Sequence, residues 1–216
     1  SDWGFSYIIG NPPYVETKYF KSSSLAMHTY LKNKYSSFEG KVDLSVLFVE
    51  RCLDLLKKDS ILGLIIQRRW FKTTYGEKAR NVIADSGYLK TLLDIGTTKL
   101  FHGRITYVSI IILQKMNKKS VEYDYIPGND CVDVINYLSK KDKVRKEIPM
   151  SFFQGRVWSP EFYDMTKIKE KYAEKIGTLG ENSSIHIRDG IQALWKKMYH
   201  ITQYYEKNNM IYGKNG

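Results

Sequence analysis

Long apolar runs, cysteines and histidines are all scarce in this sequence of 216 residues. No apolar run approaches the about 20 residues needed to cross a bilayer, which excludes a membrane-spanning protein. The two cysteines, Cys52 and Cys131, lie far apart and form no CxxC pair, and the four histidines form no cluster. We therefore expect free thiols and no structural metal.

An export signal is also missing from the N-terminus, which shows no basic region followed by an apolar core and a small-residue cleavage site. We therefore expect a cytoplasmic protein. Acidic residues are in the minority, with 23 Asp and Glu against 34 Lys and Arg, and the formal net charge is +11. This charge favours a polyanionic partner, but many basic proteins bind no nucleic acid, so charge alone does not identify the partner.

Strand and helix patterns alternate through the first half of the chain. Short apolar runs at residues 5–9, 61–66 and 88–95 predict strands, and the run at 5–9 shows little alternation, as in a strand covered on both faces. Apolar residues at three- and four-residue steps predict a helix over 43–58, and a second helix is expected over 75–86. This order predicts an α/β fold with a doubly wound sheet.

Two further stretches belong to the same domain. The apolar run 106–114 follows the strand 88–95 across a connection too short for a helical crossover, so we expect the two strands to pair antiparallel and to end the sheet. The polar stretch 18–41 predicts a mobile loop after the first strand.

The segment Asn11-Pro12-Pro13-Tyr14 ends the first strand at a rigid, polar corner. Open α/β sheets bind their ligands at the carboxyl ends of their strands. The two prolines fix the backbone and supply no amide hydrogen, so the corner presents carbonyl oxygens and the Asn11 side chain. A stiff turn with local hydrogen bonds is the alternative interpretation of these four residues.

The same corner could orient a nitrogen nucleophile. If the Asn11 side-chain oxygen and the Pro12 carbonyl each accept one hydrogen of an exocyclic amine, the nitrogen keeps its lone pair free to attack. The two acceptors would also stabilise the positive charge that develops on the nitrogen as it takes up a methyl group. The Tyr14 ring could stack on the planar base that carries the amine.

The motif and its surroundings resemble the S-adenosylmethionine-dependent amino-methyltransferases, in which Asp, Asn or Ser, two prolines and an aromatic residue follow the fourth strand. The resemblance extends through IIGNPPY, DLSVLFVERCLDLL, ILGLII and KLFHGRITYVSIIILQK, in the order seen in adenine-N6 DNA methyltransferases of restriction–modification enzymes, and more weakly through IHIRDGIQALWKKMYHI. It implies the C-terminal half of a Rossmann-like class I methyltransferase sheet, with S-adenosylmethionine as cofactor and double-stranded DNA as partner.

The resemblance implies a catalytic motif formed by Asn11, Pro12, Pro13 and Tyr14, in which each residue has the role of the family residue that it matches. Asn11 and Pro12 would accept hydrogen bonds from the adenine amino group, and Tyr14 would stack on the flipped base. Phe101 would form the other face of that stack. The cofactor would be bordered by Pro13 and by Phe48 in the helical stretch.

The resemblance also divides the chain. It implies a partial catalytic domain over residues 1–145, a helical spacer over 146–180 and the start of a target-recognition domain over 181–216. The composition also changes along the chain, because it becomes lysine-rich after Lys115. Gln67 stands where relatives carry proline after the next strand, so we expect a different local loop there.

The family's glycine-containing cofactor loop and its acidic ribose ligand lie upstream of the motif, and no GxGxxG follows any expected strand here. We therefore expect a piece of a longer enzyme that by itself binds S-adenosylmethionine weakly and methylates nothing. The strand at 5–9 would then have an open edge, through which the chain could self-associate.

Three other functions stay open at this point. An amino-methyltransferase with this motif could act on RNA or on a protein glutamine, although the basic composition suits duplex DNA better. Glu16-Thr17-Lys18 and Glu39-Gly40-Lys41 match the weak ExK half of a nuclease motif. The chain could also be a non-catalytic DNA-binding or assembly module.

Overall fold

A computed structural model describes the chain over residues 3–39, 42–98, 100, 107–126, 128, 130–140, 144–172, 201–207 and 210–215. The chain divides into two compact units, Ser1–Lys167 and Ile168–Gly216. The first unit holds a six-stranded sheet, and the second holds a two-stranded one. Over the described ranges, no helix combines the length and the apolar character needed to cross a membrane.

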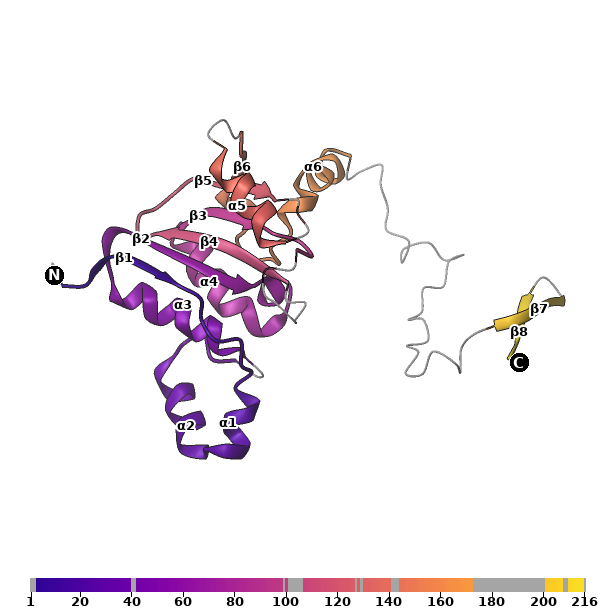
Figure 1. Ribbon diagram of the computed structural model, residues 1–216, viewed down its shortest axis with the longest axis horizontal. Helices are drawn as coiled ribbons and strands as arrows, with labels where there is room; N and C mark the ends of the chain where they lie inside the picture. Colours follow the sequence, from indigo (N-terminus) through magenta and orange to yellow (C-terminus); the bar gives the residue numbers. More distant parts are fainter. Residues whose placement is uncertain are drawn as a thin grey trace. The chain divides into compact units, whose positions relative to one another are not determined.

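The sheet of the first unit has the strand order β1-β2-β4-β3-β5-β6 (Figure 1). Its strands are β1 (Phe5–Gly10), β2 (Leu56–Gln67), β3 (Leu89–Asp94), β4 (Val108–Gln114), β5 (Ser120–Tyr125) and β6 (Lys146–Pro149). The pairs β1–β2 and β3–β5 are parallel, whereas β4 is antiparallel to both of its neighbours and β6 is antiparallel to β5. The predicted α/β fold is confirmed, including the antiparallel pairing of β3 with β4. The prediction that this pair ends the sheet is wrong, because β5 pairs with β3 and β6 pairs with β5.

The antiparallel strand β4 brings the ends of its neighbours into register. Ser109 pairs with Ile66 of β2 on one side and with Asp94 of β3 on the other, and Asp94 pairs in turn with Tyr125 of β5. The carboxyl ends of β2, β3 and β5 therefore lie along one edge of the sheet. β1 runs parallel to β2 and ends at the same edge, which is where the ligands of open α/β sheets bind.

Helices cover both faces of this sheet. On one face, α3 (Leu44–Leu55) and α4 (Glu77–Asp85) pack buried side chains such as Val49 and Ile83 against the even-numbered positions of β2. On the other face, α5 (Cys131–Ser139) packs Val134 over Leu93 and Val108. The helix predicted over 43–58 and the one predicted over 75–86 are thus confirmed with shorter bounds.

The stretch that follows the first strand is helical, so the loop predicted over 18–41 is wrong. It contains α1 (Lys18–Ser23) and α2 (Leu25–Lys34), and the side chain of Ser24 caps α2 by accepting a hydrogen bond from the amide of Met27. The helix α2 could not be predicted from the sequence because it has no apolar stripe. Leu31 is its only buried residue among those described.

The strand β1 is an edge strand, and the prediction that it is covered on both faces is wrong for the described residues. Ile8 packs against the core under α3, but Tyr7 and Ile9 on the opposite face are 73% and 89% exposed. The apolar run correctly predicts a strand but does not say which elements cover it. The helix α5 lies over β3 and β4 and leaves this face of β1 open.

The remaining elements follow the sheet in the chain. α6 (Tyr163–Lys171) comes after β6, and the second unit contains the hairpin of β7 (Ile201–Lys207) and β8 (Met210–Asn215). The sheet continues through β6, past residue 145, at which the sequence places the end of the catalytic domain. The three-part division of the chain stays a prediction.

Two isoleucines of the sheet differ strongly in burial, and replacing each of them tests whether β1 is exposed in solution. Ile111 of β4 is fully buried, so we expect Ile111→Ala to lower the free energy of unfolding by about 2–5 kcal/mol, because it removes packed methyl groups and leaves a cavity. Ile9→Ala makes the same chemical change at an exposed strand position and should cost less than about 0.5 kcal/mol. Urea unfolding of both variants measures this, and similar losses would mean that Ile9 is covered in solution.

Candidate functional site

The polar corner lies directly after β1, at the edge where the carboxyl ends of the parallel strands meet. Asn11 and Pro13 are exposed, whereas Pro12 between them is buried. The rigid pair of prolines thus holds Asn11 at the surface of the site instead of letting the chain continue as a strand.

Tyr14 ties this corner to the sheet. Its hydroxyl lies 2.8 Å from Asn11 Oδ1 and 3.1 Å from the carbonyl oxygen of Ile65, so the single proton is donated to these two acceptors. The ring is half-buried and packs on the face of the sheet that α5 covers. Burial and the negative charge of Asp43 raise the pKa of Tyr14 to about 12, so the phenol stays a donor at neutral pH.

Asn11 keeps acceptor capacity beyond this contact. A carboxamide oxygen has two lone pairs, and the Tyr14 hydroxyl uses one of them. In this contact Oδ1 is the end of the amide that faces the hydroxyl, so the Tyr14 proton can be donated to it. The Asn11 side chain is therefore presented as an oriented acceptor.

The residues after the motif are fastened to the start of α3. The carbonyl oxygen of Val15 accepts from the amide of Leu44 at 2.9 Å, and the amide and hydroxyl of Thr17 donate to the carbonyl of Val42 at 2.9 and 2.8 Å. Asp43 caps α3 by accepting from the amide of Ser45 at 2.8 Å. Burial raises the pKa of Asp43, although the bonds from Ser45 oppose this shift. The corner is thus held at both ends.

A partly buried ion pair joins the neighbouring strand ends. Asp94 ends β3 and accepts from Arg68 at 2.8 Å and from the amide of Gly96 at 2.8 Å, while the amide of Arg68 donates to the carbonyl of Tyr107 at 3.1 Å. Burial raises the pKa of the Asp94 carboxyl, and the bonds from Gly96 and Arg68 counteract it. Arg68 thereby connects the ends of β2, β3 and β4 beside the corner.

The loop after β2 begins at Gln67, and its difference from the loop of the relatives stays a prediction. A 3-10 turn, Arg68–Phe71, begins directly after Gln67, and Trp70 in this turn is fully buried. Trp70 packs on Trp158 with ring centroids 5.6 Å apart, and the amide of Trp158 donates to the Phe71 carbonyl at 2.9 Å. Aromatic packing against the segment after β6 therefore fixes this loop.

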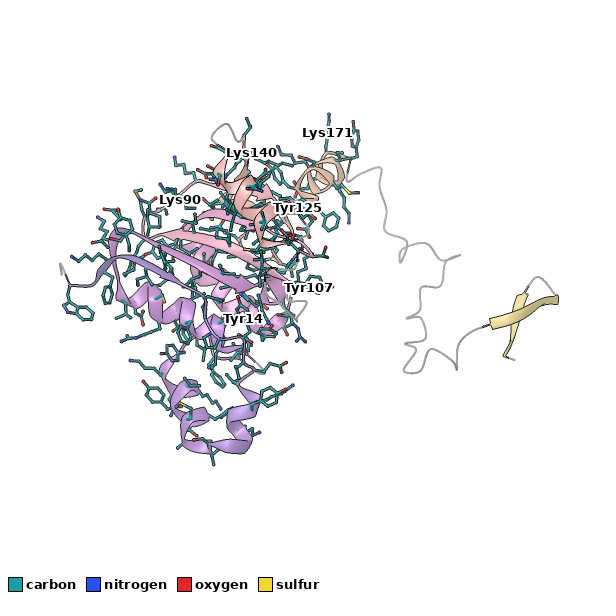
Figure 2. All side chains as sticks on the ribbon, in the orientation of Figure 1. Tyr14, Lys90, Tyr107, Tyr125, Lys140 and Lys171 are labelled. Carbon is teal, nitrogen blue, oxygen red and sulfur yellow. The ribbon has the colours of Figure 1, made fainter. Side chains whose placement is uncertain are left out.

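Two further tyrosines stand at the same edge and were not predicted as site residues. Tyr107 precedes β4 and Tyr125 ends β5, and they are 53% and 52% exposed. Figure 2 shows both at the end of the sheet away from Lys90, which lies near the start of β3. The sequence places each tyrosine at the end of an expected or observed strand. Only the strand register shows that the two tyrosines lie at the same edge of the sheet. Phe101, the predicted second stacking residue, lies outside the described residues.

Phe48 lies on the first half of α3, away from the motif in sequence but on the helix to which the motif is fastened. It is 44% exposed and lines a pocket of about 100 Å³ together with Leu31, Tyr35, Leu44, Leu47 and Arg51. An apolar and aromatic lining fits a planar ring. The pocket is smaller than the about 300–1,000 Å³ typical of ligand sites and its lining contains no carboxylate, so it fits only part of a nucleoside cofactor.

The described residues contain no candidate metal site. Over the part of the chain that the structure describes, no group of three or more His, Cys, Asp or Glu side chains could hold a metal ion. The chemical groups that the edge does offer are an oriented amide oxygen, a proline-fixed backbone and exposed aromatic rings. These groups suit a planar molecule that carries an amine.

Comparisons with known proteins point to one family. Residues 1–101 match the model of the Eco57I restriction-modification methylase family. The type II restriction enzyme and methyltransferase RM.Eco57I of Escherichia coli is 27% identical over 98% of the chain, which covers 21% of that protein. The type II methyltransferase M.PaeR7I of Pseudomonas aeruginosa is 30% identical over 58% of the chain, which covers 22% of it. The chain thus spans about a fifth of the length of these curated relatives.

Solved structures share the fold of a large part of the chain. The type IIG restriction endonuclease BpuSI matches with a TM-score of 0.54 and 15% identity, over 78% of this chain and 22% of that one. DrdV, solved as a complex with DNA, matches with a TM-score of 0.50 and 15% identity, over 66% of this chain and 17% of that one. At these identities the likeness shows the fold alone. The resemblance predicted from the motif is nevertheless confirmed by sequence, because the segment 1–101, which contains the motif, matches the model of the Eco57I restriction-modification methylases.

Proposed function

We propose that the chain is part of a site-specific DNA methyltransferase of a restriction–modification system, which transfers a methyl group from S-adenosylmethionine to the N6 amino group of a flipped adenine. The observation that carries the proposal is the acceptor corner, in which Asn11 is exposed, oriented by Tyr14 and fixed by Pro12 at the carboxyl edge of the sheet. The family match over the same residues supports it.

In this proposal, Asn11 and Pro12 position the nucleophile. The remaining lone pair of Asn11 Oδ1 accepts one amino hydrogen and the Pro12 carbonyl accepts the other, so the amine is held as a near-attack conformer. The bound cofactor supplies an electrophilic methyl group on a sulfonium. As the new carbon–nitrogen bond forms, the carbon–sulfur bond of the sulfonium would break and leave a neutral thioether. The same two oxygens would stabilise the charge on nitrogen, which then loses one proton to water.

Tyr14 has two separable roles in this scheme. Its hydroxyl orients Asn11 and anchors the corner to Ile65, while its ring provides an apolar surface on which the flipped base can stack. Phe101 is proposed to complete the stack from the other side. Pro13 and the Phe48 pocket are proposed to border the planar part of the cofactor, since the lining is apolar and aromatic.

Double-stranded DNA is the proposed partner. The chain carries a net charge of +11, which favours a phosphate backbone, and extrusion of the target base explains why the corner offers acceptors at the surface. RNA and protein glutamine carry amines that the same corner could hold, and they remain the alternatives. A non-catalytic DNA-binding role is the other alternative for this chain, which spans about a fifth of its relatives.

Self-association through the sheet edge is also proposed. The strand β1 pairs with β2 alone among the described strands, and Phe5, Tyr7 and Ile9 on it are all more than half exposed. An edge with free backbone groups and apolar side chains favours pairing with a further strand. That strand could come from a second copy or from another segment of the protein.

The replacement Asn11→Ala tests the acceptor. It removes the side-chain oxygen that holds the amine, so we expect methyl transfer by the intact protein to fall by about 10²–10³-fold, as when one preorganised polar group is removed elsewhere. Affinity for duplex DNA should change less than threefold, because Asn11 is not proposed to contact phosphates. Transfer of tritiated methyl to unmodified phage DNA measures the rate, and unchanged turnover would sink the proposal.

Two replacements at Tyr14 separate its roles. Tyr14→Phe keeps the ring but loses the hydroxyl, so it should capture the base normally while kcat falls, whereas Tyr14→Ala should also weaken capture, by about 1–3 kcal/mol. Phe101→Ala should weaken capture to a similar extent. The measurement is the fluorescence of 2-aminopurine placed at the methylated adenine, after that adenine has been located by sequencing modified phage DNA. An unchanged signal in Tyr14→Ala would assign the ring to packing alone.

A further inference from the structure

The helical part of the segment between the motif and α3 carries only basic charge, and Glu16 and Glu39 flank it. Residues 17–38 contain four lysines, Lys18, Lys21, Lys32 and Lys34, and no aspartate or glutamate. Lys18 forms an ion pair with Glu16 at 2.8 Å, while the other three are exposed. A surface with positive charge alone is complementary to a polyanion and repels a basic partner.

This segment folds into a helical hairpin, α1 and α2, that extends away from the sheet beyond α3 (Figure 1). The two helices contact each other, and the core reaches into the hairpin only at Leu31 among the described residues of α2. Large side chains stay exposed on it, with Tyr19 at 58% and Tyr30 at 57%. Its residues therefore contribute little to the core, and their exposure needs another explanation.

The hairpin is anchored at both ends. Thr17 is buried at its start and bonds to Val42 through both amide and hydroxyl. At its end, the amides and hydroxyls of Ser36 and Ser37 all donate to the carboxylate of Glu50 on α3. Burial would raise the pKa of Glu50, but these four bonds lower it, so the carboxylate stays charged and holds its partners. The lysines are thus carried on a fixed projection.

We propose that this hairpin is an arm that contacts the DNA backbone beside the flipped base, with Lys21, Lys32 and Lys34 neutralising phosphates. This inference rests on the proposed function and adds the surface that the duplex occupies. The arm starts four residues after Tyr14, so a duplex that delivers its base to the corner passes close to it. Lysines are depleted from protein–protein interfaces, whereas lysine with exposed tyrosine is typical of surfaces that bind phosphate and sugar.

The test compares two triple variants of the full chain. Lys21, Lys32 and Lys34 are changed to glutamine in the first, and Lys58, Lys90 and Lys119 in the second. The second set lies at or just before the starts of β2, β3 and β5, at the edge opposite the corner, and lowers the net charge equally. Fluorescence anisotropy with a labelled duplex at several NaCl concentrations gives the slope of log K against log salt, and circular dichroism checks the fold.

We expect the slope for the arm variant to become less negative by about 0.9 for each phosphate that the variant no longer neutralises, up to about 2.7 for three phosphates. The control variant should keep a slope close to that of the unchanged chain. Equal slopes for the two variants would overturn the arm while leaving DNA as the partner. If the unchanged chain shows no salt-dependent affinity for the duplex, the proposal that DNA is the partner is wrong, and the proposal of a DNA-binding arm is then wrong as well.

Discussion

The hydroxyl of Tyr14 connects the acceptor corner to the sheet, because its proton is directed to Asn11 Oδ1 and to the Ile65 carbonyl. Without this contact the amide of Asn11 could rotate, and its oxygen would no longer face a fixed direction. The raised pKa of the phenol keeps the donor intact at neutral pH. The orientation of the proposed nucleophile therefore depends on a single phenolic proton and on the strand pairing that places Ile65 beside it.

Other contacts of the first unit fix the carboxyl edge of the sheet, where the corner lies. The antiparallel strand β4 sets the ends of β2 and β3 level, and Arg68 joins them through its ion pair with buried Asp94. On the other side of the corner, Asp43 starts α3 and the arm returns to Glu50 on the same helix. The corner, the Phe48 pocket and the basic arm are all fastened to α3, so one helix holds together the proposed sites of the base, the cofactor and the DNA backbone.

Local patterns predict the elements whose apolar residues face the core. The helix α3 follows from periodicity and the strands β1 to β4 follow from short apolar runs, while the motif follows from the chemistry of Asn11 and two prolines. The helix α2 could not be predicted because it buries only Leu31 among its described residues. The exposure of Ile9 and the gathering of Tyr107 and Tyr125 could not be predicted either, since they depend on which elements cover or adjoin each strand.

The central claim is that the corner holds an adenine amino group by its two hydrogens. The most direct measurement is a high-resolution structure of the intact protein with a duplex that contains its target adenine and a cofactor analogue that cannot transfer its methyl group. We expect a flipped adenine whose N6 lies within hydrogen-bonding distance, about 2.7–3.2 Å, of both Asn11 Oδ1 and the Pro12 carbonyl. An amino group bound elsewhere, with Asn11 facing only Tyr14, would contradict it.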